Sequence, residues 1–278
     1  MTTRPQIRSA DGIDLYATFY PGDNPRGVLI VSHGLGEHAD CYDALASEVA
    51  AMPNMLDVLT FDYRGHGHSP GKRGVIRSYA DFLADLDAAI AWVGHARPGK
   101  PIYLLGHSNG GQVVLHVALR NDGKIAGVVV SNPSLRILAA VPRHKYVAAL
   151  FLRKFGPRVT LTSTVLDEHL TSDPASLATR KLDPLRHSKI SAPLFFGMTE
   201  GGLSVIARAE EIRLPILMIV SGRDPVVDPK TTLAFFARIG SADKTLKVFP
   251  EMLHEPLNEI GREAVVDVIV GWLSRHAG

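Results

Sequence analysis

The chain has 278 residues, of which 46% are hydrophobic and 21% charged, so it is long and apolar enough to form one large globular domain. Thirty Lys and Arg residues balance 28 Asp and Glu residues to a net charge of +2, which argues against a nucleic-acid partner and favours a small-molecule one. No stretch has the apolar core of a signal peptide or the length of a membrane span. Cys41 is the only cysteine, which excludes an internal disulfide, and we expect a cytoplasmic protein.

The first elements in the chain are short. Residues 6–20 alternate in polarity around Asp11 and Gly12 and predict an N-terminal hairpin. Continuous β-branched or leucine-rich runs, typical of strands covered on both faces, then occupy residues 27–34, 57–62, 101–107, 125–131, 215–222 and 245–250. Helical patterns occupy residues 42–52, 78–96 and 231–240, the second opening on an N-capping signal at Ser78 and Asp81. This alternation predicts a mostly parallel, doubly wound α/β sheet that binds ligands at the carboxyl ends of its strands.

One interval breaks the alternation. Residues 134–208 contain helical stretches and several prolines but no convincing strand. A structureless loop of that length is improbable inside a compact domain, so we expect a helical insertion. The predicted organisation is a core of residues 1–133 and 209–278 with an inserted segment of residues 134–208.

Residues 106–110 read G-H-S-N-G and form a G-x-S-x-G motif around Ser108. The motif follows the predicted strand 101–107 and precedes residues 111–121, which have helical spacing. Strand–turn–helix is the context in which such a serine acts as a nucleophile with a strained backbone. The alternative is a glycine-rich bend without chemistry.

A serine nucleophile needs a histidine base and a carboxylate that orients it, which follow as acid and then histidine in this fold. Asp224 lies just beyond strand 215–222, and His254 lies just beyond strand 245–250. Taken alone, Asp224 could be a turn-forming residue before Pro225, and His254 could be a surface or helix-capping histidine. Together, in this order, they predict a triad with Ser108. Asp228 is the competing acid, and we expect it to cap the helix that starts near Pro229.

An oxyanion hole is expected beside the triad. Residues 33–36 form a glycine-rich turn after the first long strand, and this turn can present the backbone N–H of Leu35. The N–H of Asn109, directly after the serine, is the second expected donor. The alternative is a tight turn that only packs on the sheet.

Several motifs together carry a resemblance to a known family. They are SHGLGEHADCYDALA, FDYRGHGHSPGKRG, GHSNGG, SGRDPVVDP, HEPLNE and the late segment KLDPLRHSKIS. The chain resembles the monoacylglycerol lipase and lysophospholipase-like branch of the α/β-hydrolases, which is grouped with the serine aminopeptidases. The resemblance implies the same triad and oxyanion donors, and a cap formed by residues 134–208 over an acyl pocket. It also implies that residues 64–69 (RGHGHS) form a structural loop, so their histidines are not expected to bind metal.

Two features bear on the substrate. The branch usually has methionine after the serine, whereas this chain has Asn109, whose side chain we expect either to tie down a neighbouring loop or to make the pocket floor more polar. In residues 141–156, Val147, Leu150, Phe151 and Phe155 share one helical face, with basic residues elsewhere. This face could contact an anionic lipid surface, although we favour packing on the core.

The resulting hypothesis is a serine hydrolase of carboxylic esters, foremost of monoacylglycerol or a similar single-chain acyl ester, that needs no cofactor or metal. Lysophospholipid, thioester or amino-terminal peptide cleavage on the same triad stays open. An aminopeptidase would need a carboxylate for the substrate ammonium group, for which Asp167, Glu168, Asp173 and Glu200 are candidates. A non-catalytic binding protein on a hydrolase fold is the remaining alternative.

Overall fold

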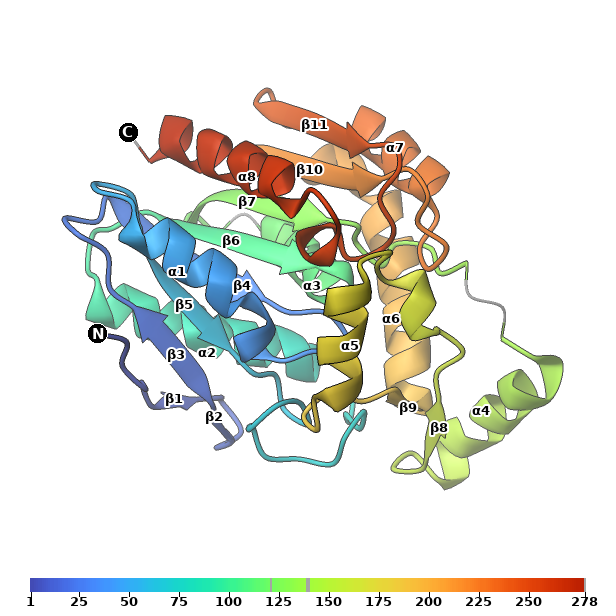
Figure 1. Ribbon diagram of the computed structural model, residues 1–278. Helices are drawn as coiled ribbons and strands as arrows, with labels where there is room; N and C mark the ends of the chain where they lie inside the picture. The colour runs from blue at the N-terminus through green and yellow to red at the C-terminus, as the bar shows by residue number, and fades with distance from the viewer. Residues whose placement is uncertain (121, 139–140, 278) are drawn as a thin grey trace.

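The computed structural model describes residues 1–120, 122–138 and 141–277 (Figure 1). Residues 121, 139–140 and 278 lie outside the described part. They fall within three predicted segments, namely the helical stretch 111–121, the insertion 134–208 and the core segment 209–278.

A seven-stranded sheet forms the centre, in the order β11-β10-β7-β6-β4-β5-β3. Its strands are β3 (Ala17–Tyr20), β4 (Gly27–Ser32), β5 (Leu56–Phe61), β6 (Ile102–His107), β7 (Ile125–Ser131), β10 (Ile216–Ser221) and β11 (Lys244–Phe249). The edge strand β3 is antiparallel to β5, and the other neighbours are parallel. Each of the six predicted runs corresponds to one strand, with ends shifted by at most two residues. The predicted α/β fold class is confirmed.

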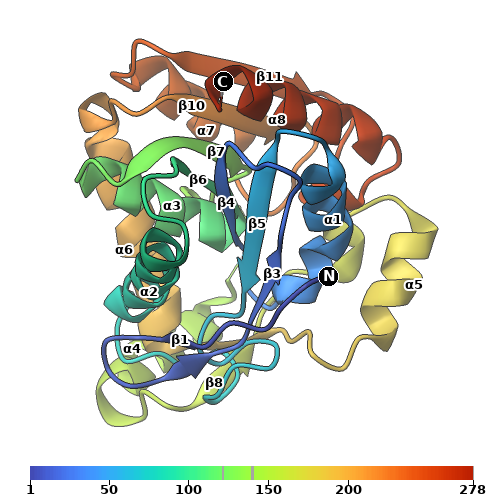
Figure 2. The same ribbon diagram turned by 90° about the vertical axis from the view of Figure 1, so that its left-hand side faces the viewer.

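Helices cover both faces of the sheet (Figure 2). One face carries α1 (Asp43–Ala51) and α8 (Arg262–His276), and the other carries α2 (Ala80–Ala96), α3 (Ser108–Arg120), α6 (Ala192–Ala207) and α7 (Pro229–Arg238). Within β4, Val28 and Ile30 contribute to the core on the α2–α3 side, while Leu29 and Val31 contribute to the core on the α1–α8 side. This division explains the continuous apolar runs, because successive side chains of a strand point to opposite faces and both are buried.

The N-terminal hairpin is confirmed, because β1 (Ile7–Arg8) pairs antiparallel with β2 (Asp14–Leu15). The capping prediction for α2 is wrong in detail. The helix begins at Ala80 without a side-chain cap, and the Asp81 carboxylate instead accepts a hydrogen bond from the Arg77 N–H at 2.8 Å. Asp81 also forms ion pairs with Arg77 and Arg64, which bind it more strongly than a helix terminus would.

The inserted segment lies beyond the carboxyl ends of the parallel strands (Figure 1). It contains helices α4 (Arg143–Phe155) and α5 (Pro174–Leu182) and ends with α6, which packs against the α2–α3 side of the sheet. It also contains two strands, β8 (Thr160–Thr162) and β9 (Lys189–Ser191), paired antiparallel. The expectation that this segment has no strand was therefore wrong. Three residues are too few to produce an alternating pattern, and the two partners are far apart in sequence.

Helix α4 does not bury the face that its sequence suggested. Val147, Leu150, Phe151 and Phe155 are 49% to 66% exposed. The contact with α6 is made by a different face of α4, which carries Tyr146, Ala149, Leu152 and Arg153. The expectation that the larger apolar face packs on the core was therefore wrong. In the described residues, no helix combines the length and apolarity needed to cross a membrane.

Candidate active site

Ser108 lies at the junction of β6 and α3, with no linker between the two elements. Its φ angle is 51°, in the left-handed region that non-glycine residues seldom occupy. The expected backbone strain at this serine is therefore confirmed. Close packing accompanies the turn, since a Cβ on Gly110 would lie 2.1 Å from the carbonyl oxygen of Ser32 at the end of β4. Glycine at this position lets α3 begin against the end of the neighbouring strand.

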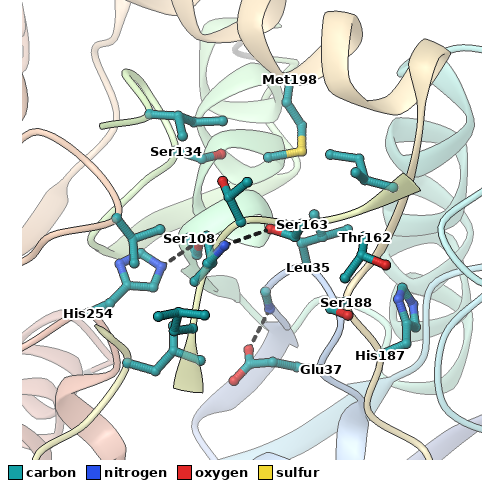
Figure 3. Close-up of a pocket in the computed structure, with 18 of the residues that line it drawn as sticks. Leu35, Glu37, Ser108, Ser134, Thr162, Ser163, His187, Ser188, Met198 and His254 are labelled. Atoms are coloured by element: carbon teal, nitrogen blue, oxygen red, sulfur yellow. Dashed lines mark hydrogen bonds between the residues drawn. The ribbon is translucent and has the colours of Figure 1, made fainter. Parts of the chain in front are cut away.

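The structure brings the three predicted triad side chains together. Figure 3 shows two of them, Ser108 and His254, in contact. His254 Nε2 lies 2.9 Å from Ser108 Oγ, and His254 Nδ1 lies 2.7 Å from Asp224 Oδ2. Asp224 follows β10 and His254 follows β11, so the loops after two adjacent parallel strands supply the acid and the histidine. The second oxygen of Asp224 accepts hydrogen bonds from the backbone N–H groups of Val226 and Val227 at 2.7 and 3.0 Å, which fixes the carboxylate.

The competing acid, Asp228, does not join this group. Its carboxylate caps α7 by accepting a hydrogen bond from the Lys230 N–H, as predicted. Two of its other contacts are with Thr231 and Arg136. The geometry therefore distinguishes Asp224 from Asp228 as the partner of His254.

The environment of His254 favours its charged form. Burial opposes protonation, but the charge of Asp224 and its hydrogen bond outweigh burial and hold the pKa of the imidazole above its ordinary value. With a carboxylate on Nδ1, that nitrogen carries a proton, and Nε2 of the neutral ring can accept the proton of the serine hydroxyl.

The loop that carries Leu35 is held by side chains on both sides of Gly34. His33 Nδ1 donates to the Gly34 carbonyl at 2.7 Å, and Glu37 Oε2 accepts from the Gly34 N–H at 2.7 Å. The Gly34 carbonyl and the Leu35 N–H belong to one planar trans peptide, so the N–H points away from His33. Leu35 lines the same cavity as Ser108 (Figure 3). This fixed peptide can serve as the first of the two predicted oxyanion donors.

Asn109 provides the second predicted backbone donor, and its side chain has a separate role. The side chain is buried, and its Oδ1 accepts a hydrogen bond from the Tyr79 hydroxyl at 2.9 Å. Asn109 is absent from the residues that line the cavity. Of the two expectations for this side chain, the first one fits the structure, because the amide ties the turn to the residue that precedes α2.

A cavity of about 650 Å³ opens beside Ser108 and His254. Much of its wall is apolar and comes from the inserted segment, including Val141, Leu152, Leu161, Val165, Leu170, Ile190, Phe195 and Met198. Ionisable side chains line another part, including Glu37, Lys145, Asp167, Glu168, Arg180, Lys181, Asp183, Arg186 and Glu255. The cavity therefore offers an apolar wall for a hydrocarbon chain and a polar wall within one space.

The polar wall contains ion pairs between the insertion and the core that sequence reasoning missed. Arg180 Nη1 lies 2.8 Å from Glu255 Oε1, and Arg186 Nη1 lies 3.7 Å from Glu37 and 3.8 Å from Glu255. Although burial opposes ionisation, the neighbouring His107 and Arg186 hold the pKa of Glu37 below its ordinary value. Glu37 directly follows the glycine-rich turn and Glu255 directly follows His254, so charged residues adjoining the motifs were the available signal.

Two groups of residues contain side chains of the types that bind metals. Residues 64–69 form a packed loop, in which His66 is buried and its Nδ1 donates to the Arg64 carbonyl. Within the described chain, His38, Cys41 and Asp183 are grouped with possible ligand atoms within 4.8 Å of one another. His38 Nε2 already shares a 2.7 Å hydrogen bond with Asp183, and burial raises the pKa of the Cys41 thiol, which disfavours the thiolate that a metal requires. We interpret this group as a contact between core and insertion.

The parallel sheet, the strained serine between β6 and α3, and the acid and histidine on later strand ends define an α/β-hydrolase. The family described as "Serine aminopeptidase, S33" (Hydrolase_4) matches residues 23–261, and the chain belongs to this family.

Proteins similar to this chain include monoacylglycerol lipases. The chain is 30% identical over 263 residues to a monoacylglycerol lipase of Mycolicibacterium smegmatis, covering 94% of this chain and 93% of that protein. It is 30% identical to the human monoglyceride lipase, covering 98% of this chain and 90% of that protein. The crystal structure of Paleococcus ferrophilus monoacylglycerol lipase has a TM-score of 0.84 at 30% identity, covering 94% of this chain and 99% of that chain.

The Tyr79–Asn109 contact leads to a first prediction. Replacing Asn109 by methionine leaves the Tyr79 hydroxyl without its side-chain acceptor, so we expect a loss of about 1–3 kcal/mol in the free energy of unfolding. The acyl-chain preference should stay unchanged, because Asn109 does not line the cavity. Urea denaturation and a panel of p-nitrophenyl esters measure the two effects.

The matched control is Tyr79→Phe, which removes the donor of the same hydrogen bond. Adding it to Asn109→Met should recover part of the lost stability, because neither partner is then left unpaired. A changed acyl preference in Asn109→Met, or a stability equal to that of the parent, would contradict this assignment.

Proposed function

We propose that this protein is a metal-independent serine hydrolase of carboxylic esters. The observation that carries the proposal is the continuous chain of contacts from Ser108 Oγ through His254 to Asp224, at 2.9 and 2.7 Å. In this proposal Ser108 is the nucleophile, His254 the general base and Asp224 the residue that orients it. The N–H groups of Leu35 and Asn109 form the oxyanion hole.

The reaction would proceed in two steps. His254 Nε2 takes the hydroxyl proton as Ser108 Oγ attacks the ester carbonyl, and the two backbone N–H groups stabilise the resulting oxyanion. His254 then returns the proton to the departing alcohol, which leaves an acyl group on Ser108. A water molecule, deprotonated by the same histidine, attacks this acyl-enzyme and releases the fatty acid. Throughout, Asp224 stabilises the transient positive charge on His254.

Monoacylglycerol or a similar single-chain acyl ester is the substrate class that we favour. The apolar wall of the cavity suits one acyl chain, and the printed names of the relatives above support the same class. Ionisable side chains suit a hydroxyl-rich alcohol, because they offer both donors and acceptors. The nearby charges include both arginines and carboxylates, an arrangement less suited to a phosphorylated headgroup than a purely basic pocket.

Aminopeptidase activity has less support. Each carboxylate considered for the substrate ammonium group already has a partner within the protein. Asp167 pairs with Arg180, Glu168 lies 3.9 Å from Lys181, Asp173 caps α5, and Glu200 pairs with Arg153. A non-catalytic binding protein is also disfavoured, since it would have no need for a strained serine in contact with a paired histidine.

We further infer that residues 134–208 act as a cap on a core of residues 1–133 and 209–278. Exposed apolar side chains on α4 support contact between this cap and a lipid surface, because a face of this kind is otherwise costly in water. Arg143 and Lys154 on the same helix would favour anionic lipids. A cytoplasmic location stays an inference from the single cysteine.

The nucleophile is tested by Ser108→Ala, because alanine lacks the hydroxyl that forms the acyl-enzyme. We expect hydrolysis of a p-nitrophenyl acyl ester to fall by roughly 10⁶-fold with folding intact, as judged by circular dichroism and thermal melting. Retention of activity by the folded variant would refute the proposed function.

The assignment of the acid is tested by comparing Asp224→Asn with Asp228→Asn. Loss of the Asp224 charge should lower kcat by about 10⁴-fold. It should also lower the pKa of His254. The acid limb of the kcat–pH profile of the remaining activity would therefore shift to lower pH than in the parent. Asp228→Asn is the matched control, since asparagine still caps a helix and activity should be retained. The opposite pattern in the kcat–pH profiles would assign the role to Asp228.

Lipid contact is tested by co-sedimentation with anionic vesicles at low salt. We expect the parent to bind and a variant with serine at positions 147, 151 and 155 to bind less, because the apolar face of α4 is removed. Hydrolysis of a water-soluble ester should be unchanged in that variant. Ile260→Ser, which alters another exposed apolar side chain, is the control. Absence of binding by the parent would remove the membrane contact from the proposal.

A further inference from the structure

The turn that follows β7, residues 132–134, contacts the segments of all three proposed triad residues. The Ser134 N–H donates to the carbonyl oxygen of Ser108 at 3.0 Å. Asn132, two residues earlier, reaches the other two segments with its side chain. No motif in the sequence marks this turn.

The side-chain amide of Asn132 both donates and accepts hydrogen bonds. Nδ2 donates to Ser221 Oγ at 2.8 Å and to the carbonyl oxygen of His254 at 2.7 Å. Oδ1 accepts from the Ser221 N–H at 2.8 Å. The residue is 1% exposed, so water competes little for these bonds. The orientation of the amide is determined. Exchanging its oxygen and nitrogen would place the oxygen against the carbonyl oxygen of His254 and the NH2 group against the Ser221 N–H.

The backbone of Asn132 is adapted to this task. Its φ angle is 41°, a left-handed conformation that asparagine tolerates better than most residues. Its own N–H donates to the carbonyl oxygen of Ile219 in β10 at 3.0 Å. Backbone and side chain together therefore fasten the turn to the strand that leads to Asp224.

The two loops that Asn132 joins set the spacing of the acid and the histidine. Ser221 is the last residue of β10 and precedes Asp224 by three positions. His254 lies in an irregular segment between β11 and the short helix η4 (Pro256–Asn258), without a strand or helix to hold it. A bond to the carbonyl of His254 itself therefore restrains the residue whose imidazole must stay 2.7 Å from Asp224 and 2.9 Å from Ser108.

We propose that Asn132 is a positioning residue that holds the backbone of His254 in register with β10, the strand that leads to Asp224. The inference rests on the proposed function. Asn132 is not among the residues that line the cavity, so its effect on the reaction is indirect. Small displacements of reacting groups are costly, so loss of this restraint should slow the chemical steps more than it weakens substrate binding.

The test is Asn132→Gly in the full-length chain, assayed with a p-nitrophenyl ester. Glycine accepts the left-handed backbone, so the substitution removes the amide without adding backbone strain. We expect kcat, corrected for active-site concentration by titration, to fall about 10–100-fold. KM should change by less than about twofold, because the cavity wall is intact. Asn132→Asp, which keeps the size and the acceptor but lacks the donor to His254, should lose kcat similarly.

Tyr103→Phe is the matched control for a purely structural effect. It removes another hydrogen bond from a buried side chain to a backbone carbonyl, that of His276, at 2.5 Å and near the end of β6 that lies away from Ser108. It should lower stability while leaving kcat unchanged. Parent-like kcat in folded Asn132→Gly and Asn132→Asp, or an equal loss in Tyr103→Phe, would overturn the inference. Ser108→Ala separates the two proposals, because activity in that variant would refute the triad whatever Asn132 does.

Discussion

The left-handed backbone of Ser108 is the constraint on which the site depends. With φ at 51°, the chain passes from β6 into α3 without a linker and leaves the hydroxyl at the carboxyl end of the sheet. Such a turn requires close contact between α3 and β4, which only glycine at position 110 permits. The same contact brings the loop of Leu35, at the end of β4, beside the serine. Because β10 and β11 run parallel to β6, their ends deliver Asp224 and His254 to the same edge.

Buried charges next to Ser108 and His254 need an explanation other than stability. Removing Glu37, Arg186 and Glu255 from water carries a desolvation cost that their mutual attraction offsets only in part. Well-packed apolar residues would often be as stable at such positions. Each pair joins the inserted segment to the core, and Glu255 is adjacent to His254. These ion pairs therefore fix the orientation of the inserted segment relative to His254, since an apolar contact would tolerate several orientations.

Much of the fold followed from the sequence, because buried parallel strands leave long apolar runs and the three triad motifs adjoin strand ends. Features that depend on contacts between residues far apart in the sequence could not be predicted from it. The strands β8 and β9 are recognisable only as a pair, and the buried face of α4 depends on Phe196, which no pattern within α4 reveals. Asp81 was expected at a helix cap but is bound by Arg77 and Arg64. Asn132 carried no signal at all, because its role arises from two loops that meet only in the folded chain.

The core and the inserted segment contribute unequally to the wall of the cavity. Of its apolar lining residues, only Leu35, Val226 and Val227 belong to the sheet and its loops, and the others come from residues 134–208. The groups that contact Ser108 and His254 through hydrogen bonds come from strand ends and the turns beside them. Substitutions in the insertion can therefore reshape the wall without moving the serine, the histidine or the acid. In the proposed reaction, chemistry and acyl selection would depend on different residues, which is why the motifs identify the reaction class more sharply than the length of the acyl chain.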